Sequence, residues 1–195
     1  MPLSPEHKNK SRIKILNSAV KRFTHQGFND TSIDQVMQDA KLTRGAFYNH
    51  FSSKSDLYQK AISHAAINSN LAKQKPADMS DKVWLDVLLT NYLSKGHIKS
   101  KGQVCPLAFL ATDIASREPK IKSTYTHAFQ NMSNLIANYA DKTTKRDEEE
   151  VLAITAMIIG SVAVARALNN QTTIDKLLKS TKAIASEMLG CNKTK

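Results

Sequence analysis

Apolar side chains recur three or four positions apart through most of this 195-residue chain, which is the spacing of one helix face. Ile13, Leu16, Val20 and Phe23 form the first such stripe. No convincing run alternates apolar and polar residues as a strand does. Six Gly and five Pro are also too few for the many tight turns of an all-β sandwich. The sequence therefore predicts an all-α fold.

Capping and turn residues divide these stripes into about nine helices. Capping boxes mark helix starts at Thr31 and Thr172, and Gly190 ends the last helix. Pro106 and Pro119 mark two further starts, because proline is favoured at the first helical position. The predicted helices cover residues 8–25, 31–40, 43–51, 52–74, 83–96, a stretch from 105 onward, 118–139, 147–168 and 172–190.

Residues 31–51, TSIDQVMQDAKLTRGAFYNHF, predict a helix-turn-helix. Lys41 and Leu42 leave room only for a tight turn between two short helices, and Thr43 can cap the second. Phe47 and Phe51 face inward in that second helix. Its other face carries the side chains of Arg44, Tyr48, Asn49 and His50, with Gly45 beside them.

The polar face of this second helix has the chemistry of a major-groove reader. A major groove admits one α-helix, in which Asn pairs with adenine and Arg with guanine or phosphate. Tyr48 and His50 have polar tips for phosphate oxygens, and Gly45 lets the backbone come close to DNA. Lys54 opens the next helix, where a cation and helix N-terminal amides together favour a phosphate.

From about residue 13 to residue 61 the sequence resembles the TetR/AcrR family of transcriptional regulators. The similar segments are ILNSAVKRFTHQGFNDTSIDQV and AKLTRGAFYNHFSSKSDLY. They contain Gly-Phe before a Thr-Ser start, and Gly-x-hydrophobic-Tyr-x-His-Phe-x-Ser-Lys. Ala46 departs from the pattern, because relatives often have Ser or Thr there. The resemblance implies a set of DNA-facing positions, to which we add the predicted cap Thr43. The predicted DNA contacts are Thr31, Ser32, Thr43, Arg44, Gly45, Ala46, Tyr48, Asn49, His50 and Lys54.

The resemblance implies an all-helical homodimer on a palindromic double-stranded DNA operator, controlled by a small-molecule effector. The predicted domains are a helix-turn-helix domain at 1–53, a connecting helix at 54–78, and a ligand-binding and dimerisation domain at 79–195. Our functional prediction is a ligand-responsive regulator, specifically a repressor released by a hydrophobic or electrophilic effector. A helical interaction protein or a small enzyme that keeps the fold without specific DNA binding is the alternative.

The charge of the chain agrees with a polyanionic partner. The formal net charge is +11, and residues 1–28 hold six Lys or Arg against one Glu. Neutralising phosphates releases condensed counterions, so a basic segment favours DNA. A soluble protein with a solvated basic face remains open as the simpler interpretation.

An effector pocket is expected among the central helices, lined mainly by apolar and aromatic residues. Cys105 precedes Pro106 at a predicted helix start, and helix N-termini favour the reactive thiolate. The hypothesis of a redox or electrophile sensor stands beside that of a small half-buried hydrophobe. The predicted ligand-binding residues are Trp84, Leu88, Tyr92, Cys105, Phe109, Tyr125, Phe129, Met132 and Met157.

The stretch from Val151 to Leu168 is apolar on nearly every face, as a helix between its own core and a partner would be. Its length is near the minimum for a membrane span, but Arg166 and its small polar residues favour a buried helix in a cytoplasmic protein. A central helix of a monomer is the alternative. The predicted dimer interface comprises Val151, Ile154, Ile158, Val162, Leu177, Ile184 and Met188.

No pattern in the sequence indicates catalysis, a metal or a cofactor. The six His are scattered without an i,i+4 pair, and the two cysteines form no Cys-x-x-Cys motif or disulfide framework. No Gly-rich phosphate loop and no nucleophile elbow occurs. We therefore predict no cofactor, no metal and no enzymatic activity.

Overall fold

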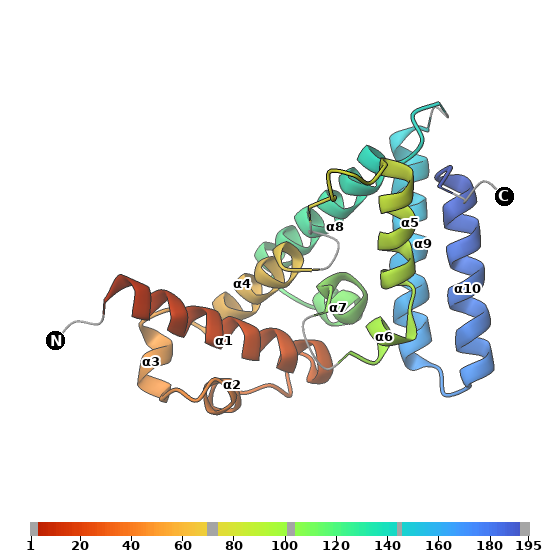
Figure 1. Cartoon of the computed structure of the whole chain (residues 1–195). Helices are drawn as coiled ribbons and strands as arrows, with labels where there is room; N and C mark the ends of the chain where they lie inside the picture. Colours follow the sequence, from red (N-terminus) through yellow and green to blue (C-terminus); the bar gives the residue numbers. More distant parts are fainter. Residues whose placement is uncertain (1–3, 70–73, 101–103, 144–145, 192–195) are drawn as a thin grey trace. The chain divides into compact units, whose positions relative to one another are not determined.

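A computed structural model describes residues 4–69, 74–100, 104–143 and 146–191. These residues contain ten helices and no strand, which confirms the all-α prediction (Figure 1). The chain divides into two compact units. Unit 1 combines Met1–Ser69 with Lys101–Ala128, and unit 2 combines Asn70–Ser100 with Phe129–Lys195. The segment 79–195, predicted as one domain, is therefore shared between the two units.

The first helix of unit 1, α1, spans Pro5–Gln26. The Ser4 side chain caps it by accepting from the N–H of His7, and Pro5 occupies the first turn, where no intrahelical bond is lost. Gly27 ends the helix with a φ of 78° and a ψ of 178°, a conformation that is essentially restricted to glycine. The chain can therefore turn sharply into the helix-turn-helix segment.

Three shorter helices follow in unit 1: α2 at Ile33–Asp39, α3 at Arg44–Tyr48 and α4 at Lys54–Ile67. The predicted capping box is present but shifted by one residue. Ser32 is the cap, its side chain accepts from the N–H of Gln35, and the Gln35 side chain accepts from the N–H of Ser32. Thr31 is buried instead, and its hydroxyl donates to the carbonyl of Gly27 at 2.8 Å.

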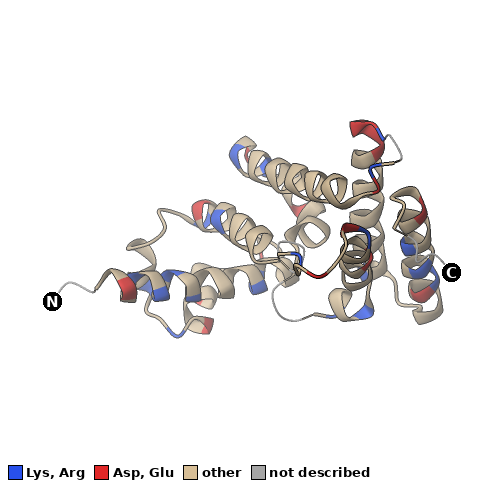
Figure 2. Cartoon of the chain, turned by 45° about the horizontal axis from the view of Figure 1, so that its top comes forward, with Lys and Arg blue, Asp and Glu red and all other residues tan. Residues whose placement is uncertain are grey.

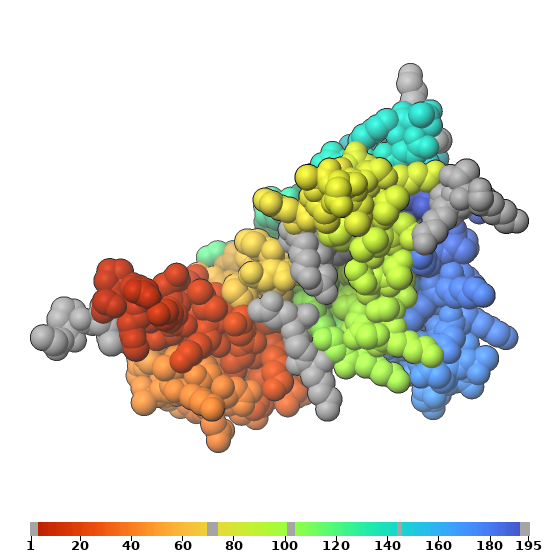
Figure 3. Space-filling view, in the orientation of Figure 1, coloured from red at the N-terminus to blue at the C-terminus, as the bar shows by residue number. Residues whose placement is uncertain are grey.

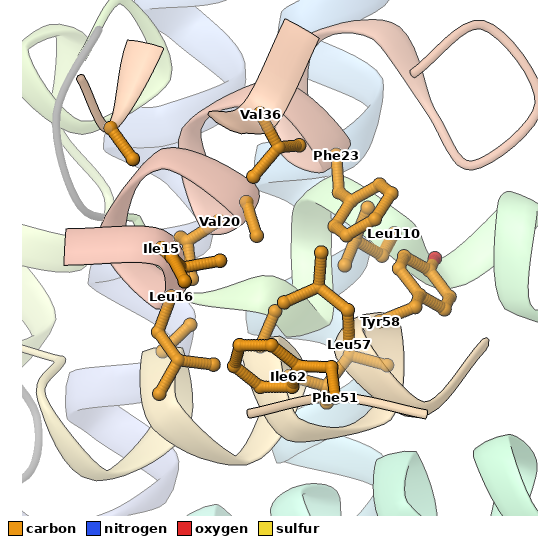
Figure 4. Packing of buried hydrophobic residues seen from close by; sticks show 14 of the residues in the cluster. Ile15, Leu16, Val20, Phe23, Val36, Phe51, Leu57, Tyr58, Ile62 and Leu110 are labelled. Carbon is orange, nitrogen blue, oxygen red and sulfur yellow. The ribbon is translucent and has the colours of Figure 1, made fainter. Parts of the chain in front are cut away.

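The core of unit 1 joins α1, α2, α4 and α7 through large side chains (Figure 4), and Phe47 of α3 belongs to it as well. Phe23, Phe47, Phe51 and Leu57 are almost completely buried in it. Burial of one such side chain contributes about 1.5–3 kcal/mol, so these few contacts hold short helices that would not be stable alone. Leu110 of α7 belongs to the same core, which therefore extends beyond the helix-turn-helix segment.

Helix α7 spans Pro106–Ile114, and α8 starts at Pro119 and runs to Tyr139. Both starts agree with the prolines that predicted them. At the end of α7, Asp113 accepts from the hydroxyl of Tyr58, from the N–H of Phe28 at 3.4 Å and from Arg117 at 3.3 Å. One carboxylate thus ties α7 to α4 and to the connection between α1 and α2.

Unit 2 contains α5 at Asp81–Tyr92, α6 at Lys95–Ile98, α9 at Glu148–Ala167 and α10 at Gln171–Met188. Helices α9 and α10 lie side by side (Figure 1) and share a bond of 2.8 Å between the hydroxyls of Ser161 and Thr181. The predicted helix at 83–96 is two helices, because the Ser94 side chain caps a new turn by accepting from the N–H of His97. Asn170, and not Thr172, caps α10.

Helix α9 is long and apolar enough to cross a membrane by length and composition, as the sequence indicated. The core helix of a soluble protein has the same composition. Ile154, Ile158 and Val162 are 0–2% exposed within the chain itself. Their burial agrees with the prediction of a core helix.

Candidate nucleic-acid interface

Helix α3 has only five residues, so it depends on tertiary packing for its stability. Phe47 and Phe51 provide that packing and are 0% and 2% exposed. Tyr48 lies between them in sequence, is 60% exposed and touches Phe47 edge-on, with ring centroids 5.2 Å apart. The buried phenylalanines therefore fix a backbone that directs Tyr48 outward.

Asn49 and His50 lie in the turn after α3, because the helix ends at Tyr48 and is shorter than predicted. The N–H groups of His50 and Phe51 both donate to the carbonyl of Phe47, at 2.9 and 3.0 Å. Asn49 is exposed and His50 is half-buried. Tyr48, Asn49 and His50 therefore all reach the surface, as the sequence predicted.

The start of α3 is open to solvent. Arg44 pairs with Asp34 at 2.8 Å, and both side chains are about 60% exposed. Such a pair contributes about 0–1 kcal/mol, so the guanidinium can exchange this partner for a phosphate or a base. Thr43 occupies the cap position without a capping bond from its side chain, and a Cβ on Gly45 would meet no atom within 4 Å.

Three other residues that were predicted to contact DNA are less accessible to it. Ala46 is half-buried and packs against the core, and Ser32 is exposed while its side chain caps α2. Thr31 is 1% exposed with its hydroxyl engaged, so it has no surface to offer DNA and leaves the candidate set. The shift of the capping box by one residue explains this difference.

Lys54 is held against the connection between α1 and α2. Its ammonium donates to the carbonyl of Asn29 at 3.3 Å and lies 4.4 Å from the ring centre of Phe28. Burial lowers the pKa of Lys54, and the nearby Arg117 lowers it further. A phosphate would have to compete with these contacts for the ammonium.

The predicted ligand-binding residues occur in both units. In unit 1, Cys105 occupies the cap position of α7 without a capping bond from its side chain, and both Cys105 and Phe109 are buried. Tyr125 donates to the carbonyl of Leu107 at 2.7 Å. Burial raises the pKa of Tyr125 to about 12. Within unit 2, Trp84, Leu88, Tyr92 and Met132 are buried, and Phe129 and Met157 are half-buried. Trp84 Nε1 is buried and finds no hydrogen-bond acceptor among the residues described.

The seven predicted interface residues have different positions in unit 2. Val151, Ile154, Ile158 and Val162 are buried within the chain, so they have little surface for a second copy. Leu177 is half-buried, whereas Ile184 and Met188 on α10 are 47% and 43% exposed. On α9 the large apolar side chain of Val164 is 53% exposed, and Val164 was not predicted as an interface residue.

Two features of unit 1 were missed by sequence reasoning. Asp113 ends an apolar helix, and nothing in its sequence neighbourhood indicates contacts with residues more than fifty positions away. Lys8 and Arg12 were noted only as part of a basic segment, although they lie beside His50. No group of three or more potential metal ligands occurs in the described part of the chain.

A family model described as bacterial regulatory proteins, tetR family, matches residues 15–61. AcrR of Shigella flexneri is 42% identical over 50 residues, which cover 26% of this chain and 23% of that protein. YfiR of Bacillus subtilis, an uncharacterized regulator, is 27% identical over 93 residues, or 48% of this chain and 44% of that protein. The chain thus spans less than half the length of these two relatives.

Similarity over most of the chain is weaker in sequence and clear in structure. LmrA of B. subtilis is 22% identical over 176 residues, which cover 84% of this chain and 90% of that protein. The reduced form of E. coli NemR superposes with a TM-score of 0.77 at 12% identity, over 94% of this chain and 99% of that one. A TetR-family regulator from Agrobacterium tumefaciens gives 0.71 at 18% identity, over 91% and 98%.

Two short helices joined by a tight turn, the second held by buried phenylalanines, have the arrangement of the helix-turn-helix segment found in a class of transcriptional regulators. Residues 15–61 match the TetR family within that class, and the fold of the chain is similar to that of TetR-family regulators. The family is the one that the motif at residues 13–61 resembled.

Proposed function

We propose that this protein is a cytoplasmic transcriptional repressor that binds a palindromic DNA operator as a homodimer and is released by a small effector. One observation carries the proposal. Tyr48, Asn49 and His50 reach the surface on a turn that Phe47 and Phe51 anchor in the core. A rigid anchor behind polar tips is what direct readout of base edges and phosphates requires.

Footprinting on the DNA upstream of the protein's own gene tests this function. Replacing Asn49 by Ala should weaken binding to the protected sequence by about 1–3 kcal/mol and relax base preference at one position of each half-site. Asn134→Ala is the matched control, because Asn134 is an exposed residue of α8. Absence of any footprint, or equal affinity and base preference in the two variants, would contradict the proposal.

Repression is supported by the name of one relative. IcaR of Staphylococcus aureus, named as a negative transcriptional regulator, is 26% identical over 49 residues, which cover 25% of this chain and 26% of that protein. A repressor needs only to occupy its operator and to be displaced from it. Occupancy of that operator with and without effector, measured together with transcription from it, distinguishes repression from activation.

A homodimer is supported by exposed apolar residues on α9 and α10. Val164, Ile184 and Met188 are each more than 40% exposed, and α10 lies at the surface in the space-filling view (Figure 3). Two copies of this helix pair would form a four-helix bundle around a two-fold axis. Such a dimer would present two recognition helices to half-sites about 34–36 Å apart.

The effector that we propose is apolar and carries a hydrogen-bond acceptor. Support comes from Trp84, whose Nε1 is buried without an acceptor in the described residues. A buried unsatisfied donor costs about 1–3 kcal/mol, which a ligand with a carbonyl would recover. Trp84 is the single tryptophan of the chain, so its fluorescence reports on this position alone.

Aromatic ketones serve as probes for this effector. They should quench Trp84 and release the protein from DNA, whereas aromatic hydrocarbons of equal size should act much more weakly. Trp84→Phe should lose the discrimination between the two classes and keep its DNA affinity. Equal responses to both classes in the wild type would argue against the acceptor.

An electrophilic effector is the second candidate, because Cys105 occupies the cap position of α7. At 6% exposure, its thiol is accessible only to a small reagent or through local opening. Release from DNA by a thiol-reactive compound, compared between the wild type and Cys105→Ser, decides the matter. Equal release from both proteins would eliminate Cys105 as a sensor.

A further inference from the structure

A hollow of about 410 Å³ lies between the start of α1 and the turn after α3. Pro5, Lys8, Asn9 and Arg12 line it from α1, and Asn49 and His50 line it from the turn. One water molecule occupies about 30 Å³ of liquid volume, so a hydrated phosphate group has ample room. All of these residues belong to unit 1.

The lining of this hollow is basic. Lys8 and Arg12 are four residues apart on one helix face, where like charges repel each other. Neither forms an ion pair with any described residue. The nearby carboxylate of Glu6 is paired with Lys10 at 2.7 Å and does not line the hollow.

Packing positions the Arg12 side chain next to the turn. The Arg12 guanidinium lies 5.1 Å from the ring centre of Phe51 and donates to the carbonyl of His50 at 3.5 Å. Burial lowers the pKa of His50, and Lys8 and then Arg12 lower it further, so the imidazole is largely neutral at pH 7. The hollow therefore offers two permanent cations, one imidazole and the amide of Asn49.

We propose that this hollow binds a backbone phosphate of duplex DNA, which makes the start of α1 a second anchor beside the recognition helix. Duplex DNA is the favoured source of the phosphate, because Asn49 and His50 belong both to the hollow and to the turn that carries the DNA-facing tips. Figure 2 shows Lys and Arg along α1, and Figure 3 shows this helix at the surface. The inference rests on the proposed function and adds α1 residues to its contacts.

Lys8→Ala and Lys10→Ala in the full-length protein form a matched pair for the test. Both lysines are exposed residues of α1, and each variant removes one positive charge. Binding to duplex DNA is measured by anisotropy across a salt series. The slope of log K against log salt is negative, and Lys8→Ala should make it less steep by about 0.9, the value for one lost phosphate contact. Lys10→Ala should leave the slope near that of the wild type.

Ethylation interference gives a second readout of the same contact. One phosphate per half-site should interfere in the wild type and in Lys10→Ala, and lose its effect in Lys8→Ala. Lys8→Arg should restore both the slope and the interference. Equal slopes and identical interference patterns in Lys8→Ala and Lys10→Ala would overturn the inference, even with DNA binding intact.

Two further outcomes separate the inference from the proposed function and from a different ligand. Failure of the wild type to bind any duplex would remove the proposed function and this inference together. Displacement of the His50 imidazole resonances by millimolar inorganic phosphate, without any change in the salt slope of Lys8→Ala, would assign the hollow to a free anion and contradict the DNA contact.

Discussion

At the scale of single residues, Asp113 has the most consequential contacts in unit 1. Its carboxylate accepts from Tyr58, from Arg117 and from the N–H of Phe28, while Arg117 also lies 4.6 Å from the ring centre of Phe28. Burial and the neighbouring carboxylate raise the pKa of Tyr58, so its hydroxyl remains a donor over the physiological range. α7 thereby contacts the segment that leads into the helix-turn-helix.

The Tyr58–Asp113 contact should be measurable as a coupling free energy. A hydrogen bond to a charged group contributes about 1.5–3 kcal/mol, so Tyr58→Phe and Asp113→Asn should each destabilise the protein by that order in urea unfolding. The double variant should lose less than the sum of the two, because both remove the same bond. Asp78→Asn, at an exposed position, is the control and should have little effect. Strict additivity would show that the two side chains act independently.

At the scale of elements, the shortness of α2 and α3 places unusual demands on the connections around them. Gly27 joins α1 to the segment before α2 with φ and ψ values that other residues rarely adopt. Gly45 lies within α3, where a side chain would meet no other atom within 4 Å. At position 27 the backbone conformation favours glycine, whereas at position 45 neither the helical backbone nor the surroundings would exclude a side chain.

The same substitution at these two glycines should have opposite effects. Gly27→Ala forces an L-residue into a strained conformation and should lower the free energy of unfolding by about 1–3 kcal/mol. Gly45→Ala should raise it by up to about 1 kcal/mol, because alanine favours a helix. Gly45→Ala should nevertheless weaken DNA binding, since the methyl group keeps the backbone away from the groove. Chemical denaturation and anisotropy measure the two effects, and unchanged DNA affinity in Gly45→Ala would contradict close backbone approach.

At the scale of the whole molecule, the proposed repressor needs a second copy to occupy two half-sites. The surface for that copy follows from the residues that remain exposed after the chain has folded. Val164 on α9 and Ile184 and Met188 on α10 meet this condition, whereas the buried stripe of α9 does not. In the proposed dimer, α9 uses one face for its own core and another for the partner.

A charge at Val164 should dissociate the dimer. Val164→Glu would bury a carboxylate in the proposed interface of each copy, which is costly without a partner charge. Sedimentation velocity should show a monomer, and affinity for the palindrome should fall with it. Val83→Glu is the matched control, because Val83 is 49% exposed on α5 and lies outside the proposed interface. A stable dimer of Val164→Glu would place the interface elsewhere.

Local patterns sufficed for the helical class and for the helix-turn-helix, because both depend on spacing and on capping chemistry between near neighbours. The exact cap residues were predicted less well, because several possible caps lie within one or two positions of each other. Ser32 caps α2 in place of Thr31, and Asn170 caps α10 in place of Thr172. Ile13, assigned to the buried stripe, is 41% exposed, whereas Ile15 is completely buried. A shift of two residues moves a side chain to another face of the helix, and the spacing of apolar residues alone did not decide between these two isoleucines.

The sequence by itself determined that this chain is helical and predicted that Tyr48, Asn49 and His50 reach the surface beside two inward-facing phenylalanines, because both properties depend on residues that are close neighbours in the chain. Only the tertiary structure decided which face of α9 stays exposed, that Asp113 contacts Tyr58, and that Lys8 and Arg12 meet His50. These contacts join residues 38 to 55 positions apart, for instance His50 with Arg12 and Asp113 with Tyr58. Their proximity follows from how the helices pack. The periodicity of one helix carries no information about which residues of another helix it contacts.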